Sequence, residues 1–264
     1  MDFKNIAQLF EHITTKNESK ELFLYKKNNS WVGLTGKDIR IAVEDISFGL
    51  RSLGIEEKSN VAIMSNNSPR WAISDYGIIC SSMTTVTIYP TLIASQVEFI
   101  LNNSKSQLIF VENQEQYLKI KDIYDSCSDL KYIVFMDDSC ENENDSLMNI
   151  SSLFDKGKKY SQSSNYSFDQ MISTIESQDI LTLIYTSGTT GIPKGVTLTH
   201  HNLLSNVKAT LQVADFDDNE KFLSFLPLSH VLERMGGHYT ALSVGAKIYY
   251  AESIEKVPEN LTET

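Results

Sequence analysis

The chain has 264 residues, 41% of them hydrophobic and 22% charged, which excludes a disordered composition and allows one large or two ordinary domains with a proper core. Its net charge of −11 disfavours nucleic acid and anionic lipid as default partners, because both are negatively charged. The 3 cysteines lie far apart without CxxC spacing, which argues against a disulfide scaffold and against a zinc site.

The N-terminal region predicts two amphipathic helices. Apolar side chains recur at helical spacing from Phe3 to Ile13, and again over residues 38–54, where Gly54 supplies the C-terminal stop. In the second helix the residues expected to face inward are Ile41, Ile46, Leu50 and Leu53. We expect the first helix to dock on its own domain, because its polar face is not basic enough for a helix that lies on a membrane.

Residues 60–137 alternate between short apolar runs and helical segments. Strands are predicted at 60–65, 84–89, 107–112 and 131–137. Helices are predicted between them, within 66–82, 94–104 and 114–125. Ser68 is placed as the N-cap of the first of these helices and Pro69 at its first helical position. Strands separated by helices indicate βαβ units and a mainly parallel sheet.

The second half of the chain predicts a polar excursion followed by another α/β stretch. Residues 138–165 are expected on the surface, with one short helix around 147–156. Strands then follow at 180–185, 195–200, 222–227 and 246–250, with helices at 201–213 and 230–242. We therefore predict a first subdomain over residues 1–175 and the start of a second over residues 176–264, with residues 251–264 as a connector.

The stretch IYTSGTTGIPKGV, residues 184–196, has the composition of a polyphosphate site. Its glycines allow the backbone N–H groups to converge on an anion, and its hydroxyl side chains add donors that suit phosphate oxygens. Lys194 supplies a positive charge on a flexible stem, and Pro193 stiffens the loop just before it. A flexible surface turn is the alternative, but a linker is not expected to end in Pro-Lys-Gly between two apolar strands.

This loop does not match the Walker A pattern. That pattern requires G-x-x-x-x-G-K-[ST] at the start of a helix. Here Gly195 follows Lys194, and the next residues, VTLT, are β-branched and alternating, which predicts a strand.

Residues 185–196 resemble the phosphate-binding signature of the adenylate-forming superfamily, which includes acyl-CoA synthetases, luciferases and peptide-synthetase adenylation domains. Three more segments resemble the same family in the same order, within 59–82, 86–113 and 198–207. The segment FLPLSHVLERMGG, residues 225–237, is similar to long-chain fatty acyl-CoA synthetases through its Pro-Leu-x-His-x-x-x-Arg run. Departures from the family are Ser82 and Met83, where small residues including a glycine are usual, and His201, where a basic residue is common.

The resemblance implies an α/β fold: the mainly parallel βαβ units of the large N-terminal domain of an adenylate-forming enzyme. The family's magnesium-positioning glutamate, ribose-binding aspartate, hinge and catalytic lysine lie further along the chain, and no Tyr-Gly-x-Thr-Glu or Thr-Gly-Asp segment occurs before Thr264. We therefore expect a truncated chain that corresponds to the first half of such an enzyme and is inactive alone.

The resemblance also assigns the site residues. The β- and γ-phosphates of ATP would be held by Thr186, Ser187, Gly188, Thr189, Thr190, Gly191 and Lys194. His230 would be the catalytic residue facing the substrate carboxylate and the α-phosphate, in the first turn of a helix with Ser229 as N-cap. Glu233 and Arg234 are either functional or an exposed pair, and the adjacent His200 and His201 are expected to cap rather than to bind a metal.

The implied activity is that of an AMP-forming fatty acyl-CoA ligase that uses ATP, Mg²⁺ and CoA, with the magnesium and CoA contacts mostly outside this chain. Two alternatives stay open: a non-catalytic nucleotide- or acyl-binding fragment, and a relative with another acid or acceptor. The N-terminus lacks a signal-peptide core, and no window holds 18 uninterrupted apolar residues. A cytoplasmic protein is therefore expected, with peripheral membrane contact as an option and no nucleic-acid partner.

Overall fold

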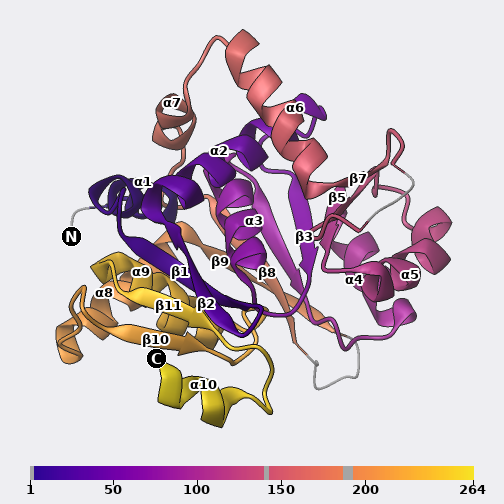
Figure 1. The fold of residues 1–264 in the computed structure, drawn as a ribbon. Helices are drawn as coiled ribbons and strands as arrows, with labels where there is room; N and C mark the ends of the chain where they lie inside the picture. Colours follow the sequence, from indigo (N-terminus) through magenta and orange to yellow (C-terminus); the bar gives the residue numbers. More distant parts are fainter. Residues whose placement is uncertain (1–2, 140–142, 187–192) are drawn as a thin grey trace.

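The computed structural model describes residues 3–139, 143–186 and 193–264. Two β-sheets and the helices packed on them form the chain (Figure 1). The larger sheet has seven strands in the order β7-β6-β5-β3-β4-β8-β9. These strands are β3 (Asn60–Met64), β4 (Thr84–Ile88), β5 (Leu108–Val111), β6 (Tyr132–Phe135), β7 (Leu147–Asn149), β8 (Ile180–Thr186) and β9 (Lys194–Thr199).

The larger sheet is parallel from β7 to β8, and only β9 runs antiparallel to its neighbour. The smaller sheet has four strands in the order β10-β11-β1-β2, of which β1 and β2 pair antiparallel. Its strands are β1 (Glu21–Lys27), β2 (Ser30–Thr35), β10 (Lys221–Ser224) and β11 (Lys247–Tyr250). The predicted mainly parallel α/β architecture is therefore present.

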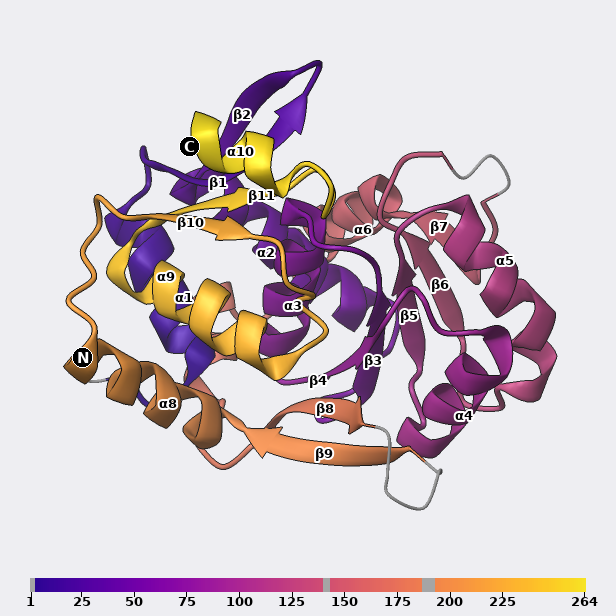
Figure 2. The same cartoon turned by 90° about the horizontal axis from the view of Figure 1, so that it is seen from below.

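Helices fill the space between the two sheets and cover the outer face of the larger one (Figure 2). The helices are α1 (Ile6–Lys16), α2 (Gly36–Ser52), α3 (Pro69–Cys80), α4 (Ala94–Ser104), α5 (Gln114–Ile123), α6 (Ile150–Ser163), α7 (Phe168–Ser173), α8 (His200–Val213), α9 (Thr240–Val244) and α10 (Val257–Glu263). A 3₁₀-helix at Tyr124–Ser126 and a π-helix at Glu233–Tyr239 complete the described helical segments.

Alternate residues of the central strand β3 enter different hydrophobic cores. Val61 and Ile63 join the core that contains α1, α2 and α3, whereas Ala62 and Met64 join the core beneath α4 and α5. This alternation follows from the period of 2 along a strand, and it explains why the whole strand reads as apolar. Helix α3 is buried along nearly its full length, because it lies between the two sheets.

The local signals around α3 act as predicted. The Ser68 hydroxyl accepts a hydrogen bond from the Trp71 N–H, and Pro69 occupies the first helical turn. This capped helix start fixes where β3 ends and where the loop after it turns.

Several local predictions were wrong. Ile41 is 45% exposed, although it was expected to face inward. The helix expected around 147–156 is present, but with other bounds: it begins at Ile150 and extends to Ser163, and Ile150 and Leu153 pack into the core. Residues 257–263 form α10 instead of a connector, and its Glu263 contacts Lys26 and Trp31 of the smaller sheet.

The β1–β2 hairpin was missed by the sequence analysis. Its two strands meet at Asn28 and Asn29, whose φ angles of 51° and 61° are the positive values that a tight type I′ hairpin turn needs. An Asn-Asn pair between two apolar runs was the available signal. Both sheets take strands from either side of residue 175. The predicted division into two subdomains at that residue stays a prediction.

Candidate functional site

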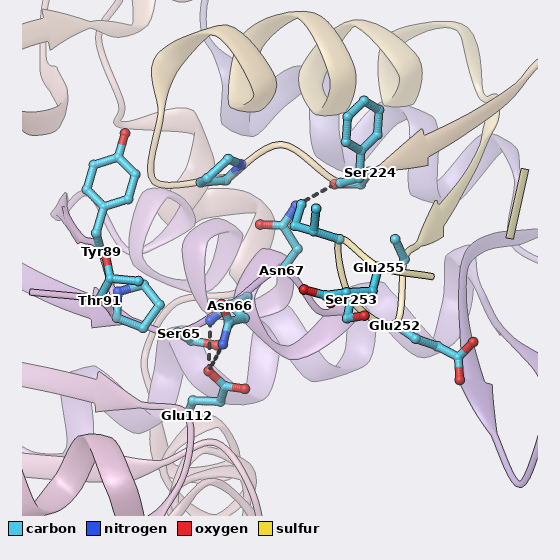
Figure 3. A pocket seen from close by; sticks show the side chains of 15 residues that line it. Ser65, Asn66, Asn67, Tyr89, Thr91, Glu112, Ser224, Glu252, Ser253 and Glu255 are labelled. Carbon is cyan, nitrogen blue, oxygen red and sulfur yellow. Dashed lines mark hydrogen bonds between the residues drawn. The ribbon is translucent and has the colours of Figure 1, made fainter. Parts of the chain in front are cut away.

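The order of the larger sheet places a switch point between β3 and β5. From β3 the chain crosses to β4 on one side, whereas from β5 it continues on the other side to β6 and β7. In open parallel α/β sheets, ligands bind at the carboxyl ends of the strands at such a point. A cavity of about 500 Å³ opens there, lined by residues that follow β3, β4, β5, β10 and β11 (Figure 3).

The cavity is acidic rather than basic. Its lining includes Glu112, Glu252 and Glu255, and among the described residues that line it none is a lysine or an arginine. A triphosphate is therefore not expected inside the cavity itself, because its charge would meet carboxylates. The groups suited to phosphate lie beside it, at the end of β8.

The β8–β9 hairpin carries the described part of the predicted phosphate loop. Thr186 and Lys194 face each other as the last pair of the ladder, and both side chains are exposed. The predicted ligands Ser187, Gly188, Thr189, Thr190 and Gly191 lie outside the described residues. The strand after the loop, predicted from its β-branched residues, is present as β9, which confirms that no helix follows Lys194.

His230 lies at the same edge of the sheet. The carbonyl of Ser229 accepts a hydrogen bond from Thr87 Oγ1 at 3.0 Å, and the Ser229 hydroxyl donates to the carbonyl of Ile88 at 3.3 Å. Thr87 pairs with Ile184 on β8, so this turn rests beside the strand that leads to Thr186. The structure thus brings His230 and the start of the phosphate loop to the carboxyl ends of two neighbouring strands.

The capping role predicted for Ser229 was wrong. The buried Ser229 hydroxyl is used by Ile88, and the Leu232 N–H instead donates to Nδ1 of His230 at 3.2 Å. Because Nδ1 accepts this hydrogen bond, it carries no proton, and the ring proton is on Nε2. Nε2–H of the exposed His230 side chain can therefore donate to a phosphate or carboxylate oxygen.

Arg234 is a buried charged group of the site region. It is fully buried and forms a bidentate ion pair with Asp75 of α3, with Nε 2.9 Å from Oδ2. Its Nη1 donates to Thr182 Oγ1 on β8 at 2.7 Å. Burial alone would lower the pKa of Arg234, but the charges and hydrogen bonds of Asp75 and Tyr239 together outweigh burial and raise this pKa. The option of an exposed Glu233–Arg234 pair was therefore wrong.

The carboxylate of Asp75 is surrounded by donors. Besides Arg234, it accepts from the hydroxyls of Tyr239 and Thr85, each at 2.7 Å. This satisfied network joins α3, β4, β8 and the π-helix in one buried cluster. A fully paired buried charge is rigid, because breaking any part leaves an uncompensated charge in the interior.

Two further buried groups lie on the π-helix, and of these the sequence analysis named only Glu233. Glu233 is only 7% exposed, burial raises its pKa, and its Oε1 has no hydrogen-bond partner within the described residues. His238 lies between the hydroxyls of Tyr76 and Tyr250, and burial lowers the pKa of His238 to about 3. His238 is therefore a neutral structural group.

His200 caps a helix, as predicted for the histidine pair, but the helix is α1 and not its own. Its Nδ1 accepts from the Ile6 N–H at 3.3 Å, and burial lowers the pKa of His200 to about 4. His201 is exposed. Within the described residues no group of three or more His, Cys, Asp or Glu side chains is placed to hold a metal ion.

Sequence reasoning missed Asn67 and Asp75. Asp75 had a signal, because a single carboxylate in the middle of the apolar helix WAISDYGII needs a buried partner. Asn67 directly follows a buried strand, at the sheet edge where ligands bind, which was the signal for it.

The AMP-binding enzyme family matches residues 10–263 of the chain. The chain belongs to this family. It is 32% identical over 251 residues to the long-chain-fatty-acid–CoA ligase ACSBG2 of Xenopus laevis, covering 94% of this chain and 34% of that protein. It is 30% identical to the long-chain-fatty-acid–[acyl-carrier-protein] ligase AEE15 of Arabidopsis thaliana, covering 86% of this chain and 32% of that protein.

The AMP-binding fold is also seen in solved structures. The inhibitor-bound N-terminal domain of FACL13 from Mycobacterium tuberculosis matches with a TM-score of 0.81 at 21% identity, covering 99% of this chain and 61% of that one. The predicted family and the predicted fold of an adenylate-forming N-terminal domain are confirmed. The chain spans about a third of the length of the curated relatives named above. Among the helices of residues 3–139, 143–186 and 193–264, none combines the length and apolarity needed to cross a bilayer.

Proposed function

We propose that this AMP-binding chain forms the phosphate- and carboxylate-binding part of a long-chain fatty acid–CoA ligase. In the proposed reaction a carboxylate oxygen attacks the α-phosphorus of ATP and pyrophosphate leaves; the sulfur of a thiol then attacks the acyl carbon and AMP leaves. The observation that carries the proposal is the convergence of His230 with the Thr186–Lys194 end of the β8–β9 hairpin at one sheet edge.

The chain's own residues would bind and orient in this reaction, with no covalent nucleophile. The Lys194 ammonium and the Thr186 hydroxyl would hold the β- and γ-phosphates, together with the proposed ligands Ser187, Gly188, Thr189, Thr190 and Gly191. Nε2–H of His230 would donate to the α-phosphate or the incoming carboxylate. Catalysis of this kind rests on positioning and on stabilising charge at the transferred phosphoryl group.

The proposed reaction also uses Mg²⁺ and CoA. Mg²⁺, when bound to ATP, neutralises phosphate charge, but the described residues provide no cluster of ligands for it, so we assign it no protein ligand in this part of the chain. CoA is the proposed thiol acceptor. Because the relative AEE15 is an acyl-carrier-protein ligase, a carrier-protein thiol is the second candidate acceptor.

The remaining parts of the proposal follow from the same chemistry. ATP and a fatty-acid carboxylate are the proposed partners, and the acidic surface makes nucleic acid a poor one. A cytoplasmic location, with peripheral membrane contact as an option, is proposed for a protein that activates fatty acids.

The assignment of Lys194 can be tested by titration calorimetry of ATP into this chain. Lys194→Ala is expected to weaken ATP binding by about 10- to 100-fold, because a lost charge-assisted contact costs ~1.5–3 kcal/mol. Lys27→Ala is the matched control, since Lys27 is an exposed strand lysine beside the β1–β2 turn. Equal ATP affinity in wild type and Lys194→Ala would overturn the assignment.

The reaction itself can be tested by pyrophosphate release from ATP with a panel of fatty acids. The measurement is made on this chain and on a protein with the full length of its relatives, and the longer protein is expected to turn over while this chain is inactive. Turnover by the longer protein only with non-fatty acids would reject the long-chain substrate, and no turnover with any acid would reject the ligase activity.

A further inference from the structure

The side chain of Asn67 holds the turn that carries His230. Its Nδ2 donates to the carbonyl of Leu226 at 2.7 Å and to the Ser224 hydroxyl at 3.0 Å, and its Oδ1 accepts from the Leu228 N–H at 2.8 Å. Figure 3 shows Asn67 reaching from the end of β3 to Ser224 at the end of β10. One amide group thus bonds three points of a five-residue segment, 224–228, that immediately precedes Ser229 and His230.

Asn67 is itself placed on a rigid support. It directly follows the Ser65–Asn66 end of the sheet, where Asn66 donates through both its backbone and its side chain to Glu112. The next residue, Ser68, is the N-cap of the buried helix α3. A side chain fixed between a sheet end and a helix start can transmit that order to a neighbouring loop.

Between the buried residues Ser224 and Leu228, the turn depends on Asn67 because residues 225–227 have little apolar packing. Phe225, Leu226 and Pro227 are exposed, so burial of their side chains does not fix the path of the backbone. On the other side of His230 the chain is already anchored by Arg234 and Asp75. Without Asn67, the approach to His230 would be held by the buried Leu228, by the contacts of Ser229 with Thr87 and Ile88, and by the hydrogen bond from the His230 N–H to the Pro227 carbonyl.

We propose that Asn67 is a positioning residue: it fixes the segment 224–228 and thereby the place of the His230 imidazole. The geometry requires an amide, because the contacts use an acceptor and a donor on the same planar group. An aspartate would keep the acceptor for the Leu228 N–H but would lose both donated hydrogen bonds. The positioning itself does not depend on the proposed function, whereas its consequence for turnover does.

The structural part is tested by amide hydrogen exchange on this chain, read by mass spectrometry over peptides that cover 225–232. Asn67→Ala is expected to speed exchange of the Leu228 and Leu232 amides by about tenfold, since loss of one hydrogen bond shifts local opening by that order. Asn67→Asp is the second variant, which keeps the size of the side chain and is expected to speed exchange less. Asn66→Ala is the matched control and should leave exchange of 225–232 unchanged, because it keeps the backbone hydrogen bond of residue 66 to Glu112 and all three hydrogen bonds of Asn67.

The melting temperature and exchange elsewhere separate a local effect from unfolding. Faster exchange confined to 225–232 in Asn67→Ala or Asn67→Asp supports the proposal. Unchanged exchange of that segment in both variants, or an equal increase throughout the chain in both, overturns it.

The catalytic consequence is tested by a double-mutant cycle of Asn67→Ala and His230→Ala in the protein with the length of its relatives. Asn67→Ala is expected to lower kcat for pyrophosphate release at least tenfold with little change in the KM for ATP. In the His230→Ala background the same substitution should have almost no further effect, because Asn67 acts through His230. Independent, multiplying losses would overturn the role in positioning His230. If the parent protein shows no turnover at all, the ligase proposal fails while the exchange result still decides the role of Asn67.

Discussion

The two sides of the candidate site are held in place by different means. On one side, His230 stands on a turn whose backbone is bonded by Asn67 and β4, and its helix is anchored by the fully buried Arg234. On the other side, Thr186 and Lys194 end a hairpin whose outer strand β9 lies at the edge of the sheet and is mostly exposed.

The rigid His230 side suits the orientation of a reacting group, and the exposed Lys194 side suits the binding of negative charge. A histidine that must meet one atom of a substrate gains from a rigid support, because small displacements of a reacting group are costly. A lysine on an exposed strand can follow a flexible polyphosphate, because a point charge has no strict angular requirement. We therefore expect substitutions on the Arg234 side to lower the free energy of unfolding, and substitutions on the Lys194 side to weaken only the binding of the ligand.

The largest expected effect is the loss of the Arg234 charge. Arg234→Met leaves the carboxylate of Asp75 buried without its cation, and removing one partner of such a pair destabilises by ~3–5 kcal/mol. Urea unfolding followed by circular dichroism measures the loss.

The control for Arg234→Met is an exposed ion pair. Glu57→Gln breaks the pair with Arg51, in which Glu57 is 57% exposed, and should change stability by no more than about 1 kcal/mol. Similar losses for Arg234→Met and Glu57→Gln would show that the buried network is not the anchor we describe.

A smaller effect concerns the pH dependence that this buried region imposes on the fold. Between about pH 3 and its ordinary value near 6.5, the unfolded chain protonates His238 and the folded chain does not. The contribution of His238 is therefore complete above pH 6.5 and is lost as the pH falls towards 3. Removing it with His238→Gln should flatten the fall in stability by up to ~1.4 kcal/mol per pH unit between about pH 4 and 6.

Other groups with shifted pKa values do not disturb the comparison of wild type with His238→Gln. His200 acts in the same direction as His238, because its pKa is lowered to about 4. Asp45 acts in the opposite direction, because burial raises its pKa to about 6 and its contribution is lost as the pH rises. Both groups are present in wild type and in His238→Gln, so the difference between urea-unfolding series at several pH values isolates His238. Parallel pH profiles would mean that His238 is protonated in the folded chain.

The sequence predicted the elements whose signals are local. Strand β3, the cap Ser68 and the helix α3 follow from an apolar run and a Ser-Pro start, and the order of strands and helices from β3 to β6 follows from the same kind of signal. The β1–β2 hairpin was missed because its polar edge residues dilute the apolar pattern. The pairing of β1 with β11, which joins Phe23 to Ile248, depends on contacts between opposite ends of the chain and has no local signal.

The sequence predicted which residues of the candidate site can bind substrate, but not the buried contacts that hold those residues in place. Lys194 and His230 were found because motifs carry them, but the burial of Arg234 and its pairing with Asp75 arise only when α3 and the π-helix meet between the sheets. The same reason explains why His230, and not Ser229, caps the helix. Ser229 is drawn into the interior by the carbonyl of Ile88, which the sequence cannot place.

The smallest expected effect tests how exposed the phosphate side is. Ile184 and Val196 face each other across the β8–β9 ladder, but Ile184 is 5% exposed and Val196 is 43% exposed. Ile184→Val should cost about 0.5–1.5 kcal/mol, because it removes a buried methylene. Val196→Thr should stay within about 0.5 kcal/mol, because the side chain already meets water and threonine suits a strand. Urea unfolding of both variants gives the comparison.

A cost for Val196→Thr equal to that for Ile184→Val would place Val196 in a dry environment. An edge strand offers unpaired backbone groups to any chain that can add a strand, so such a result would mean that another segment or a second copy covers β9 in solution. The phosphate side would then be held as firmly as the His230 side, and Lys194 would act from a fixed position. A small cost for Val196→Thr keeps β9 exposed and keeps the contrast between the two sides of the site.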